Sequence, residues 1–351
     1  MNDESIQLRV TQVQAETAAA TSFFLAPVDG RPVDYRAGQF LTVLVPRNNQ
    51  VARRSYSLSS APGEPLQLTI KRVQNGDISR YLTSGLRVGD TITSLRPAGR
   101  FTLDAHQPGD LLLLGAGSGI SPLFSILKDV LRHQPSRRVT LLYSNTTEAT
   151  IIFRDELAGW QATYPDRFRL IHLLSRPVTS HTGRPGRLNN LLLEQMLPEL
   201  TGSSDPTTLQ FYVCGPSDYM RMVQFTLTVN GIQPAQIRRE NFVIQSAVVD
   251  SALALLPPEA TVDRTIALQF RGRTTELHVP GRKSVLQAAL DVGIALPYSC
   301  RGGRCSTCLA RCRSGTIYMT INDVLTERDL REGWVLTCTG YPMNDTVRLE
   351  V

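Results

Sequence analysis

The chain has 351 residues, of which 42% are hydrophobic and 19% are charged. This composition excludes a disordered or collagen-like protein, and the length predicts two or three domains. The formal net charge is +6, but basic and acidic residues are interspersed, which argues against nucleic-acid binding. No run reaches the roughly 18 apolar residues of a membrane span. The acidic, polar residues 1–5 form no signal segment, so we expect a soluble cytoplasmic protein.

Short alternating segments fill the N-terminal part of the chain. Residues 7–11 and 66–70 alternate polar with apolar side chains, and turn signals occur at residues 28–30, 61–63 and 74–77. Many short strands separated by turns are typical of an antiparallel barrel or sandwich. We therefore predict an antiparallel β-domain over residues 1–106.

The pattern changes near residue 108, where apolar strands begin to alternate with helical segments. Strand-like runs occur at residues 111–114, 139–143, 168–174 and 210–213, and residues 123–131 carry apolar side chains at helical spacing. Such alternation predicts a parallel sheet with crossover helices. We assign this α/β domain to residues 107–245.

A proline-containing segment at residues 246–261 is typical of a linker. Beyond it, residues 265–271 and 274–279 resemble a strand pair, and residues 284–292 a short helix with Ser284 as a possible N-cap. The sequence thus predicts a third domain over residues 262–351.

Five of the six cysteines lie between residues 300 and 338. Cys300, Cys305 and Cys308 have the spacing C-x4-C-x2-C, and Cys338 follows after 29 residues. This is the plant-type spacing of 2Fe–2S ligands. Structural zinc usually takes two C-x2-C pairs, of which only one is present, so we favour the cluster over zinc. For Cys312 we favour a small buried hydrophobe over a role at the site.

The cluster loop contains two glycines, which allow the backbone to wrap closely and to point N–H groups at the sulfurs. Residues 299–308 resemble the cluster loop of the ferredoxin family, and the resemblance covers residues 262–351. Four arginines surround this segment, either as ordinary solvated charge or as a docking surface for an acidic partner. They are Arg301, Arg304, Arg311 and Arg313.

A glycine-rich turn at residues 115–119 joins a predicted strand to a helix. Glycines allow the backbone to approach a phosphate, and a helix N-terminus supplies N–H donors. The spacing G-x-G-x-G differs from the Rossmann fingerprint, and a purely structural turn would use the same residues. A second small-residue turn at residues 214–217 follows a later strand, at the edge where ligands bind in such sheets. The expected nucleotide residues are Gly117, Ser118, Gly119, Ile120, Cys214, Gly215 and Pro216.

Residues 53–59 form a basic, hydroxyl-rich strand whose simplest explanation is surface solvation. Within them, Arg54, Tyr56 and Ser57 match the R-x-Y-S flavin motif of the ferredoxin–NADP reductase superfamily. The order of the three motifs matches as well, so the chain resembles three-domain reductase components of bacterial oxygenase systems. These include the phenylacetyl-CoA epoxidase reductase and hybrid-cluster-protein reductase groups. The resemblance implies an FAD-binding antiparallel barrel, an NAD(P)-binding α/β domain and a β-grasp 2Fe–2S domain.

The resemblance also implies residue roles. Arg54 would neutralise the flavin pyrophosphate, Tyr56 would pack on the isoalloxazine, and Ser57 would place its hydroxyl near the flavin N5. Ser79 and local backbone amides would contact phosphate, whereas Lys71 is almost equally well explained as solvated strand charge. The expected flavin residues are Arg54, Ser55, Tyr56, Ser57, Ile70, Lys71, Gly76, Ile78 and Ser79.

Three residues are candidate catalytic residues by the same resemblance: Ser57, Cys214 and Glu240. Cys214 would lie near the nicotinamide, with a buried apolar thiol as the alternative. Glu240 and Phe242 match a Glu and an aromatic residue near the flavin of related reductases, and a structural role for this pair is equally well supported.

The choice between NADPH and NADH depends on Ser175 and Arg176. A Ser-Arg pair at the matching place in ferredoxin–NADP reductases binds the 2′-phosphate, which a hydroxyl and a guanidinium suit. The preceding strand has no acid until Glu148, whereas an NADH site usually places one earlier. The sequence therefore favours NADPH. The alternative is that Arg176 is a solvated strand end.

We predict a reductase that passes electrons from NAD(P)H through FAD to a 2Fe–2S cluster and then to a partner protein, an oxygenase or hydroxylase component. One alternative within enzymes is a reductase of a free ferredoxin or a small acceptor. The other is a non-catalytic iron–sulfur redox sensor, which the loss of Arg54, Ser57 or the Gly117 loop would favour; all are present.

Overall fold

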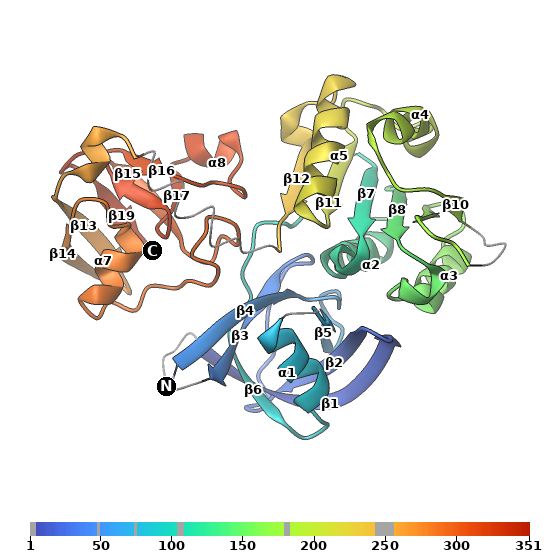
Figure 1. The fold of residues 1–351 in the computed structure, drawn as a ribbon, viewed down its shortest axis with the longest axis horizontal. Coiled ribbons are helices and arrows are strands. Elements are labelled where there is room, and N and C mark those ends of the chain that lie inside the picture. The colour runs from blue at the N-terminus through green and yellow to red at the C-terminus, as the bar shows by residue number, and fades with distance from the viewer. Residues whose placement is uncertain (1–4, 48–49, 74–75, 104–108, 179–182, 243–255) are drawn as a thin grey trace. The chain divides into compact units, whose positions relative to one another are not determined.

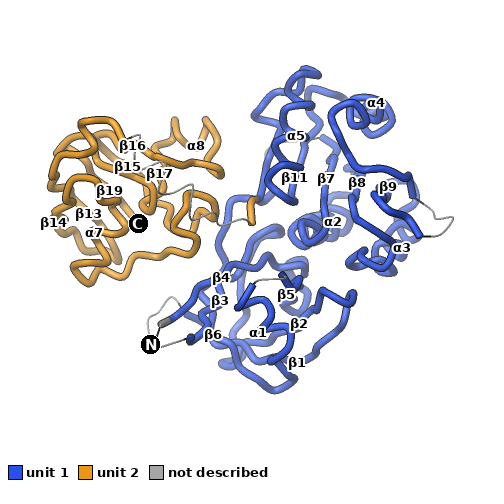
Figure 2. Tube along the Cα trace, viewed as in Figure 1, with its two compact units in different colours: residues 1–240 blue, residues 241–351 orange. Residues whose placement is uncertain are grey.

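The computed structural model (Figure 1) describes residues 5–47, 50–73, 76–103, 109–178, 183–242 and 256–351. The chain forms two compact units, residues 1–240 and residues 241–351, which Figure 2 distinguishes by colour. Among the described residues there is no helix with the length and apolar content of a membrane span.

The N-terminal part of the first unit is a six-stranded antiparallel sheet with the order β4-β3-β6-β1-β2-β5. Alternate side chains such as Leu8 and Val10 point into a shared core. A bridge from Leu58 to Leu68 joins the end of β4 to β5, so the two edges meet and the predicted barrel is confirmed. The elements are β1 Ser5–Thr17, β2 Ala20–Pro27, β3 Phe40–Arg47, β4 Gln50–Ser57, β5 Leu66–Lys71, α1 Asp77–Gly85 and β6 Thr91–Leu95.

The second half of this unit is a parallel sheet with the order β10-β9-β8-β7-β11-β12 and helices on both faces (Figure 1). One core contains residues of α2 and α3, and the other contains residues of α4 and α5. The predicted crossover architecture is therefore confirmed. The strands are β7 Leu111–Ala116, β8 Val139–Asn145, β9 Phe168–Leu174, β10 Arg184–Pro185, β11 Gln210–Cys214 and β12 Ile237–Glu240. The helices are η1 Gly117–Gly119, α2 Ile120–His133, η2 Glu148–Thr150, α3 Arg154–Thr163, α4 Asn190–Thr201, α5 Ser217–Val229 and η3 Pro234–Gln236.

A buried ion-pair cluster joins the barrel to the α/β part. Glu64, in the loop before β5, accepts a hydrogen bond from Lys128 Nζ at 2.5 Å and lies 2.6 Å from Arg132 Nη1, both on α2. The Lys128 side chain is only 6% exposed. Burial alone would raise the pKa of Glu64, but the adjacent cations outweigh it and lower the pKa. These charges hold together two elements that are distant in sequence.

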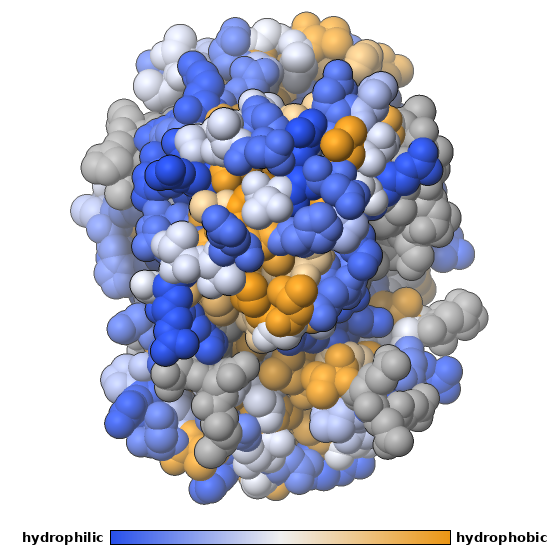
Figure 3. Space-filling view, turned by 90° about the vertical axis from the view of Figure 1, so that its left-hand side faces the viewer, coloured by the Kyte–Doolittle hydropathy of each residue, from blue (hydrophilic) through white to orange (hydrophobic). Residues whose placement is uncertain are grey.

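The second unit contains a five-stranded mixed sheet with the order β14-β13-β19-β15-β17 and one helix, α7, packed on it. Ser284 Oγ caps α7 by accepting from Gln287 N, as predicted. Cys308 and Cys338 lie within its core, and the β-grasp class is confirmed. Figure 3 shows hydrophobic side chains among the hydrophilic ones on one face of the molecule. The elements are η4 Pro258–Thr261, β13 Arg264–Phe270, β14 Arg273–Val279, α7 Val285–Asp291, β15 Leu309–Ser314, β16 Ile317–Met319, α8 Glu327–Arg331, β17 Trp334–Leu336, β18 Gly340–Pro342 and β19 Arg348–Glu350.

The predicted domain limits remain predictions. The limit between residues 106 and 107 and the one between residues 245 and 246 fall outside the described residues. Of the predicted linker at residues 246–261, only residues 256–261 are described.

The Glu64 cluster leads to a stability prediction for the first unit. We expect Lys128→Met to lower its free energy of unfolding by about 3 kcal/mol, because the buried Glu64 carboxylate loses a cation. The exposed pair of Arg221 and Asp218 provides a control, since Arg221→Met should cost less than about 1 kcal/mol. The lowered pKa of Glu64 stabilises the folded protein at pH values above the usual pKa of a glutamate. The loss of unfolding free energy in Lys128→Met should therefore shrink as the pH falls below that value.

This prediction can be measured by urea unfolding followed through tryptophan fluorescence. The two tryptophans lie in different units, so a Trp334→Phe background leaves Trp160 to report on the first unit alone. Equal losses in Lys128→Met and Arg221→Met would show that the buried cluster adds nothing beyond a surface pair.

Candidate functional site

The predicted flavin motif lies at the end of β4. Ser57 is 5% exposed, and its hydroxyl has no hydrogen-bond partner among the described residues. Burial raises the pKa of Tyr56 to about 12, and the nearby Arg54 guanidinium opposes that shift. Ser55 differs, because its hydroxyl lies 3.0 Å from Thr42 Oγ1 within the barrel. An unpartnered buried hydroxyl beside an arginine and a half-buried ring is the arrangement that a flavin would satisfy.

The second predicted flavin segment connects β5 to the N-terminus of α1. Ser79 Oγ accepts from Val73 N at 3.1 Å and donates to Gly76 O at 3.2 Å, so this hydroxyl shapes the turn. A Cβ at Gly76 would lie 2.7 Å from Ser79 Oγ, which explains the glycine. Ile70 and Ile78 are buried in the barrel core. Of this segment, the backbone at the start of α1 is therefore the part that could meet a phosphate.

The nucleotide turns meet at the carboxyl edge of the parallel sheet. The chain adds β8, β9 and β10 on one side of β7 and β11 and β12 on the other, so the strand order reverses between β7 and β11. Gly117, Ser118 and Gly119 follow β7, and Gly215 and Pro216 follow β11. Ligands bind at such a switch point in open α/β sheets.

Close backbone contact fixes this junction. A Cβ at Gly119 would lie only 2.1 Å from the Cys214 carbonyl oxygen, so no other residue fits without a shift. Gly117 has φ +55°, and its carbonyl accepts from Tyr143 Oη at 2.9 Å. Ile120, which begins α2, is fully buried. Packing therefore requires the glycine at residue 119, and the left-handed backbone conformation favours the glycine at residue 117.

Cys214 and Glu240 are neighbours on adjacent strands. They are register partners between β11 and β12, and both are buried. Burial, and then the Glu240 carboxylate, raise the pKa of the Cys214 thiol well above its ordinary value. Cys214 therefore stays a neutral thiol near pH 7, suited to contact a ring and unsuited to act as a nucleophile. Phe242 is 40% exposed.

One predicted flavin residue lies at the predicted nucleotide turn. Lys71, at the end of β5, places its Nζ 3.4 Å from the position that a Gly117 Cβ would occupy. This ammonium therefore lies at the glycine turn, which gives it a location beyond that of a solvated strand charge. At this point the barrel and the α/β part bring one candidate cofactor residue of each together.

Ser175 and Arg176 extend the same carboxyl edge beyond β9. Ser175 N donates to Asn145 O at 3.0 Å, and Arg176 N donates to Thr146 O at 2.8 Å, while both side chains are exposed. Glu148 is turned toward the backbone, because its carboxylate accepts from Val178 N at 3.1 Å. The backbone of both residues is therefore fixed beside the end of β8, while the Ser175 hydroxyl and the Arg176 guanidinium are exposed to solvent.

The four predicted cluster ligands converge within the second unit. The Cys300 thiol interacts with those of Cys305 and Cys338, and Cys338 also interacts with Cys308. Among the described residues, no group of three or more His, Cys, Asp or Glu side chains is arranged to hold a metal ion; the thiols meet in pairs. The adjacent Cys300 thiol, and then burial, raise the pKa of Cys305 well above its ordinary value.

Backbone donors surround the sulfurs, as a cluster of thiolates requires. Gly302 N and Arg304 N both donate to Cys300 Sγ at 3.4 Å, and Cys300 N donates to Cys305 Sγ at 3.4 Å. Donors of this kind stabilise negative charge on the sulfurs. The Cys312 thiol donates to Ser314 O at 3.1 Å. Cys312 packs against the core of the unit but is only half-buried, so it is less buried than the small hydrophobe that we predicted.

Three family models match successive parts of the chain. They describe an oxidoreductase FAD-binding domain at residues 8–103, an oxidoreductase NAD-binding domain at residues 113–225 and a 2Fe-2S iron-sulfur cluster binding domain at residues 268–343. Together they cover the barrel, the parallel sheet and the cysteine-containing unit.

Curated relatives match over almost the whole chain. The ferredoxin reductase component of 3-ketosteroid-9-alpha-monooxygenase from Mycobacterium tuberculosis is 34% identical, over 99% of this chain and 96% of the relative. A component of 1,2-phenylacetyl-CoA epoxidase from Escherichia coli is 30% identical, over 97% of this chain and 96% of the relative. The chain belongs to the three-domain ferredoxin–NADP reductase superfamily. It is an NAD(P)H-dependent flavin and iron–sulfur oxidoreductase.

A solved structure shows the same fold. Phthalate dioxygenase reductase, described as a modular structure for electron transfer from pyridine nucleotides to [2Fe-2S], aligns with a TM-score of 0.61. The alignment covers 99% of this chain and 98% of that chain at 22% identity. The three-domain architecture predicted from the order of the motifs is therefore confirmed.

Some residues at this reductase's cofactor edge escaped the sequence reasoning. The side chains of Ser121 and Ser144 have buried hydroxyls without a hydrogen-bond partner among the described residues, and the Asn145 amide nitrogen is likewise unpartnered. Tyr143 supports the glycine turn by donating a hydrogen bond from its Oη to the Gly117 carbonyl oxygen. The signal that could have found them is their place, since each lies at or just beyond the carboxyl end of a strand.

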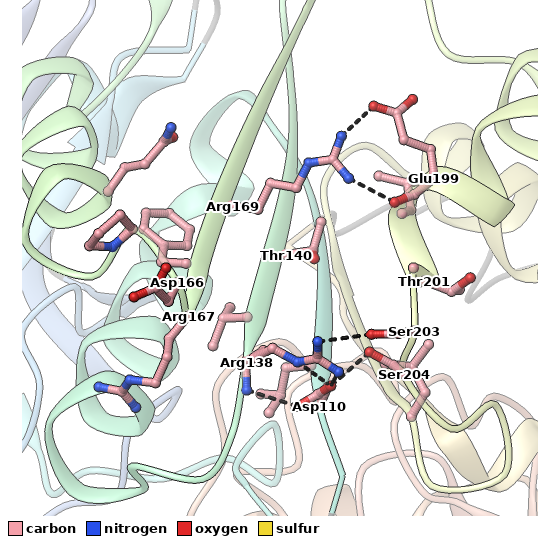
Figure 4. A pocket seen from close by; sticks show the side chains of 18 residues that line it. Asp110, Arg138, Thr140, Asp166, Arg167, Arg169, Glu199, Thr201, Ser203 and Ser204 are labelled. Atoms are coloured by element: carbon pink, nitrogen blue, oxygen red, sulfur yellow. Dashed lines mark hydrogen bonds and ion pairs between the residues drawn. The ribbon is translucent and has the colours of Figure 1, made fainter.

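A pocket of about 350 Å³ lies at the opposite edge of the parallel sheet, near the amino ends of β7, β8 and β9. Figure 4 shows two of its arginines engaged by carboxylates: Arg138 contacts Asp110, and Arg169 contacts Glu199. None of the predicted cofactor residues lines it, so we assign no cofactor to this pocket.

The convergence of the cysteines leads to a ligand prediction. We expect Cys338→Ser to lose the visible absorbance and EPR signal of the cluster while FAD stays bound, because a hydroxyl is a poor substitute for a thiolate on iron. Cys312→Ser is the matched control and should keep both signals. The measurement is iron and flavin content with the two spectra. A Cys338→Ser protein with an unchanged cluster spectrum would contradict the assignment.

Proposed function

We propose that this reductase passes electrons from NADPH through FAD to its 2Fe–2S cluster and on to an oxygenase or hydroxylase component. The observation that carries the proposal is the approach of the flavin segment to the nucleotide turn, where Lys71 Nζ lies at Gly117. Two cofactors that exchange a hydride must be held in contact. The cofactors, when bound, supply the hydride and electron chemistry, and the protein supplies orientation and tuning.

Each predicted residue has a task that fits its surroundings. Gly117 and Gly119 have no side chains that would hold the nicotinamide nucleotide away from the flavin. Cys214 offers a neutral, buried surface at the switch point. The unpartnered Ser57 hydroxyl would donate to the flavin ring near N5, and Arg54 would balance the pyrophosphate charge.

The proposal of an oxygenase partner is supported by what the relatives are named for. Besides the ketosteroid monooxygenase component, a reductase subunit of glycine betaine monooxygenase from Chromohalobacter salexigens is 29% identical over 88% of this chain. Reduction of a free ferredoxin or a small acceptor is the alternative within enzymes. A non-catalytic sensor is less well supported, since Arg54, Ser57 and the Gly117 loop, whose loss would favour it, are all present.

The exposed Ser175 and Arg176 side chains support NADPH as the reductant. They lie next to each other at the strand end beside β8, where a hydroxyl and a guanidinium can bind a phosphate dianion. Glu148, the nearest acid after β8, accepts hydrogen bonds from Val178 N.

We further propose that the protein works in the cytoplasm, where thiols stay reduced, since none of its six cysteines forms a disulfide.

The proposed function leads to a prediction about hydride transfer. Anaerobic addition of NADPH should bleach the flavin and then the cluster of the wild-type protein. Gly119→Ala should slow flavin bleaching by about 100-fold, because the added Cβ displaces the turn from the Cys214 carbonyl. Gly159→Ala is the matched control, since a Cβ there meets nothing within 4 Å. The measurement is stopped-flow absorbance. An unreactive wild-type protein would support the sensor alternative instead.

The proposed function also leads to a prediction about the choice between NADPH and NADH. Arg176→Ala should lower kcat/KM for NADPH about tenfold or more, the effect of losing a charge-assisted contact worth about 1.5–3 kcal/mol. NADH, which lacks the phosphate, should be almost unaffected. Arg169→Ala, at the opposite edge of the sheet, is the control. Equal losses for both cofactors, or a wild-type preference for NADH, would show that Arg176 does not bind the 2′-phosphate.

A further inference from the structure

Arg304 stands inside the cluster loop, directly before the ligand Cys305. Its side chain is only 11% exposed, and its Nε donates to Asp323 Oδ2 at 2.8 Å. This differs from the docking role that the sequence allowed for it. Arg301 remains exposed above the Tyr298 ring, whereas the Arg304 guanidinium is turned into the protein. A buried arginine beside a ligand calls for an explanation other than partner docking.

The segment that carries Asp323 packs tightly against the same loop. Asp323 N donates to Gly303 O at 3.0 Å. Gly303 has φ +71°, and a Cβ there would lie 2.3 Å from the Ile321 carbonyl oxygen. The loop and the segment at residues 321–323 are therefore joined by backbone contact as well as by the ion pair.

This segment is also tied to the strand end that carries the fourth ligand. Thr339, which follows Cys338, donates from its Oγ1 to Ile321 O at 2.8 Å, and Thr320 N donates to Thr339 O at 3.0 Å. Residues 320–323 thus bridge the loop of the first three cysteines and the fourth cysteine. Arg304 and Asp323 connect the two halves of the ligand set.

Arg304 also reaches a ligand through its backbone. Its N–H donates to Cys300 Sγ at 3.4 Å. Because the guanidinium is held by Asp323, the ion pair fixes the orientation of the residue whose amide contacts the sulfur. The pair also places two opposite charges close to the site at which an electron is gained and lost. Each charge alone would shift the reduction potential, in opposite directions.

We propose that Arg304 and Asp323 form a positioning pair that sets the reduction potential of the cluster by balancing their charges beside it. Loss of Arg304 leaves the Asp323 carboxylate uncompensated and makes reduction less favourable. Loss of Asp323 removes the negative charge that faces the guanidinium and makes reduction more favourable. The inference rests on the four cysteine ligands and is independent of the nicotinamide cofactor and of the partner protein.

The test is an EPR-monitored redox titration of the full-length holoprotein with chemical reductant. We expect Arg304→Gln to lower and Asp323→Asn to raise the cluster potential, each by about a tenfold change in the reduction equilibrium, which is about 59 mV for one electron. The double variant should return toward the wild-type value. Arg304→Lys, which keeps the charge, should stay near wild type.

Arg313→Gln provides a matched control, because Arg313 pairs with Glu350 in the same unit at an exposed site. Its potential should be unchanged. Shifts of the same sign in Arg304→Gln and Asp323→Asn, or no shift in either, would overturn the proposal. Loss of the cluster from Arg304→Gln, Asp323→Asn and Arg304→Lys alike, measured by iron content, would assign the pair a purely structural role and would also overturn it.

Discussion

The contact between Gly119 and the Cys214 carbonyl is the constraint on which the nucleotide half of this reductase depends. With 2.1 Å between a virtual Cβ and that oxygen, only a glycine lets the first turn of α2 sit against the end of β11. The packing places the strand-order reversal, the neutral Cys214 thiol and the buried Glu240 within one small region. Under the proposed function, a bound dinucleotide would lie at this edge, where the barrel supplies Lys71.

In the second unit, close backbone contacts hold the loop that carries the cysteines. Its loop must place four sulfurs close together and still offer N–H groups to them, which costs strained backbone at Arg301 (φ 51°) and Ser306 (φ 51°). Neither is a glycine, so the surrounding contacts must hold these conformations. The backbone contacts of residues 320–323 with Gly303 and Thr339 supply such support. The ligand loop is therefore shaped by a segment that itself contributes no ligand.

Sequence reasoning found the parts of this protein that depend on local pattern. Strand alternation predicted an antiparallel barrel or sandwich, helical spacing a parallel sheet with crossover helices, and the cysteine spacing the cluster, since each is a pattern read directly along the chain. The barrel and the β-grasp fold were implied by the family resemblance. It could not find the Glu64–Lys128 pair or the Arg304–Asp323 pair, because charges 64 and 19 residues apart carry no mark that they will meet. It also gave Arg304 and Arg313 as equals, although one is buried and the other is exposed.

The two ion pairs show why such contacts matter in a protein that moves electrons. The Lys128 side chain is 6% exposed and that of Arg304 11%, and a largely buried charge left alone is costly. Each cation is matched by a carboxylate from a distant segment, Glu64 or the 38% exposed Asp323, and the match fixes the geometry of both segments. At Glu64 the fixed geometry is that of the barrel against α2. At Asp323 it is that of the ligand loop against the fourth cysteine. Because the rate of hydride transfer and the potential of a cluster both respond to small displacements and to nearby charge, we expect contacts of this kind to matter at both proposed sites.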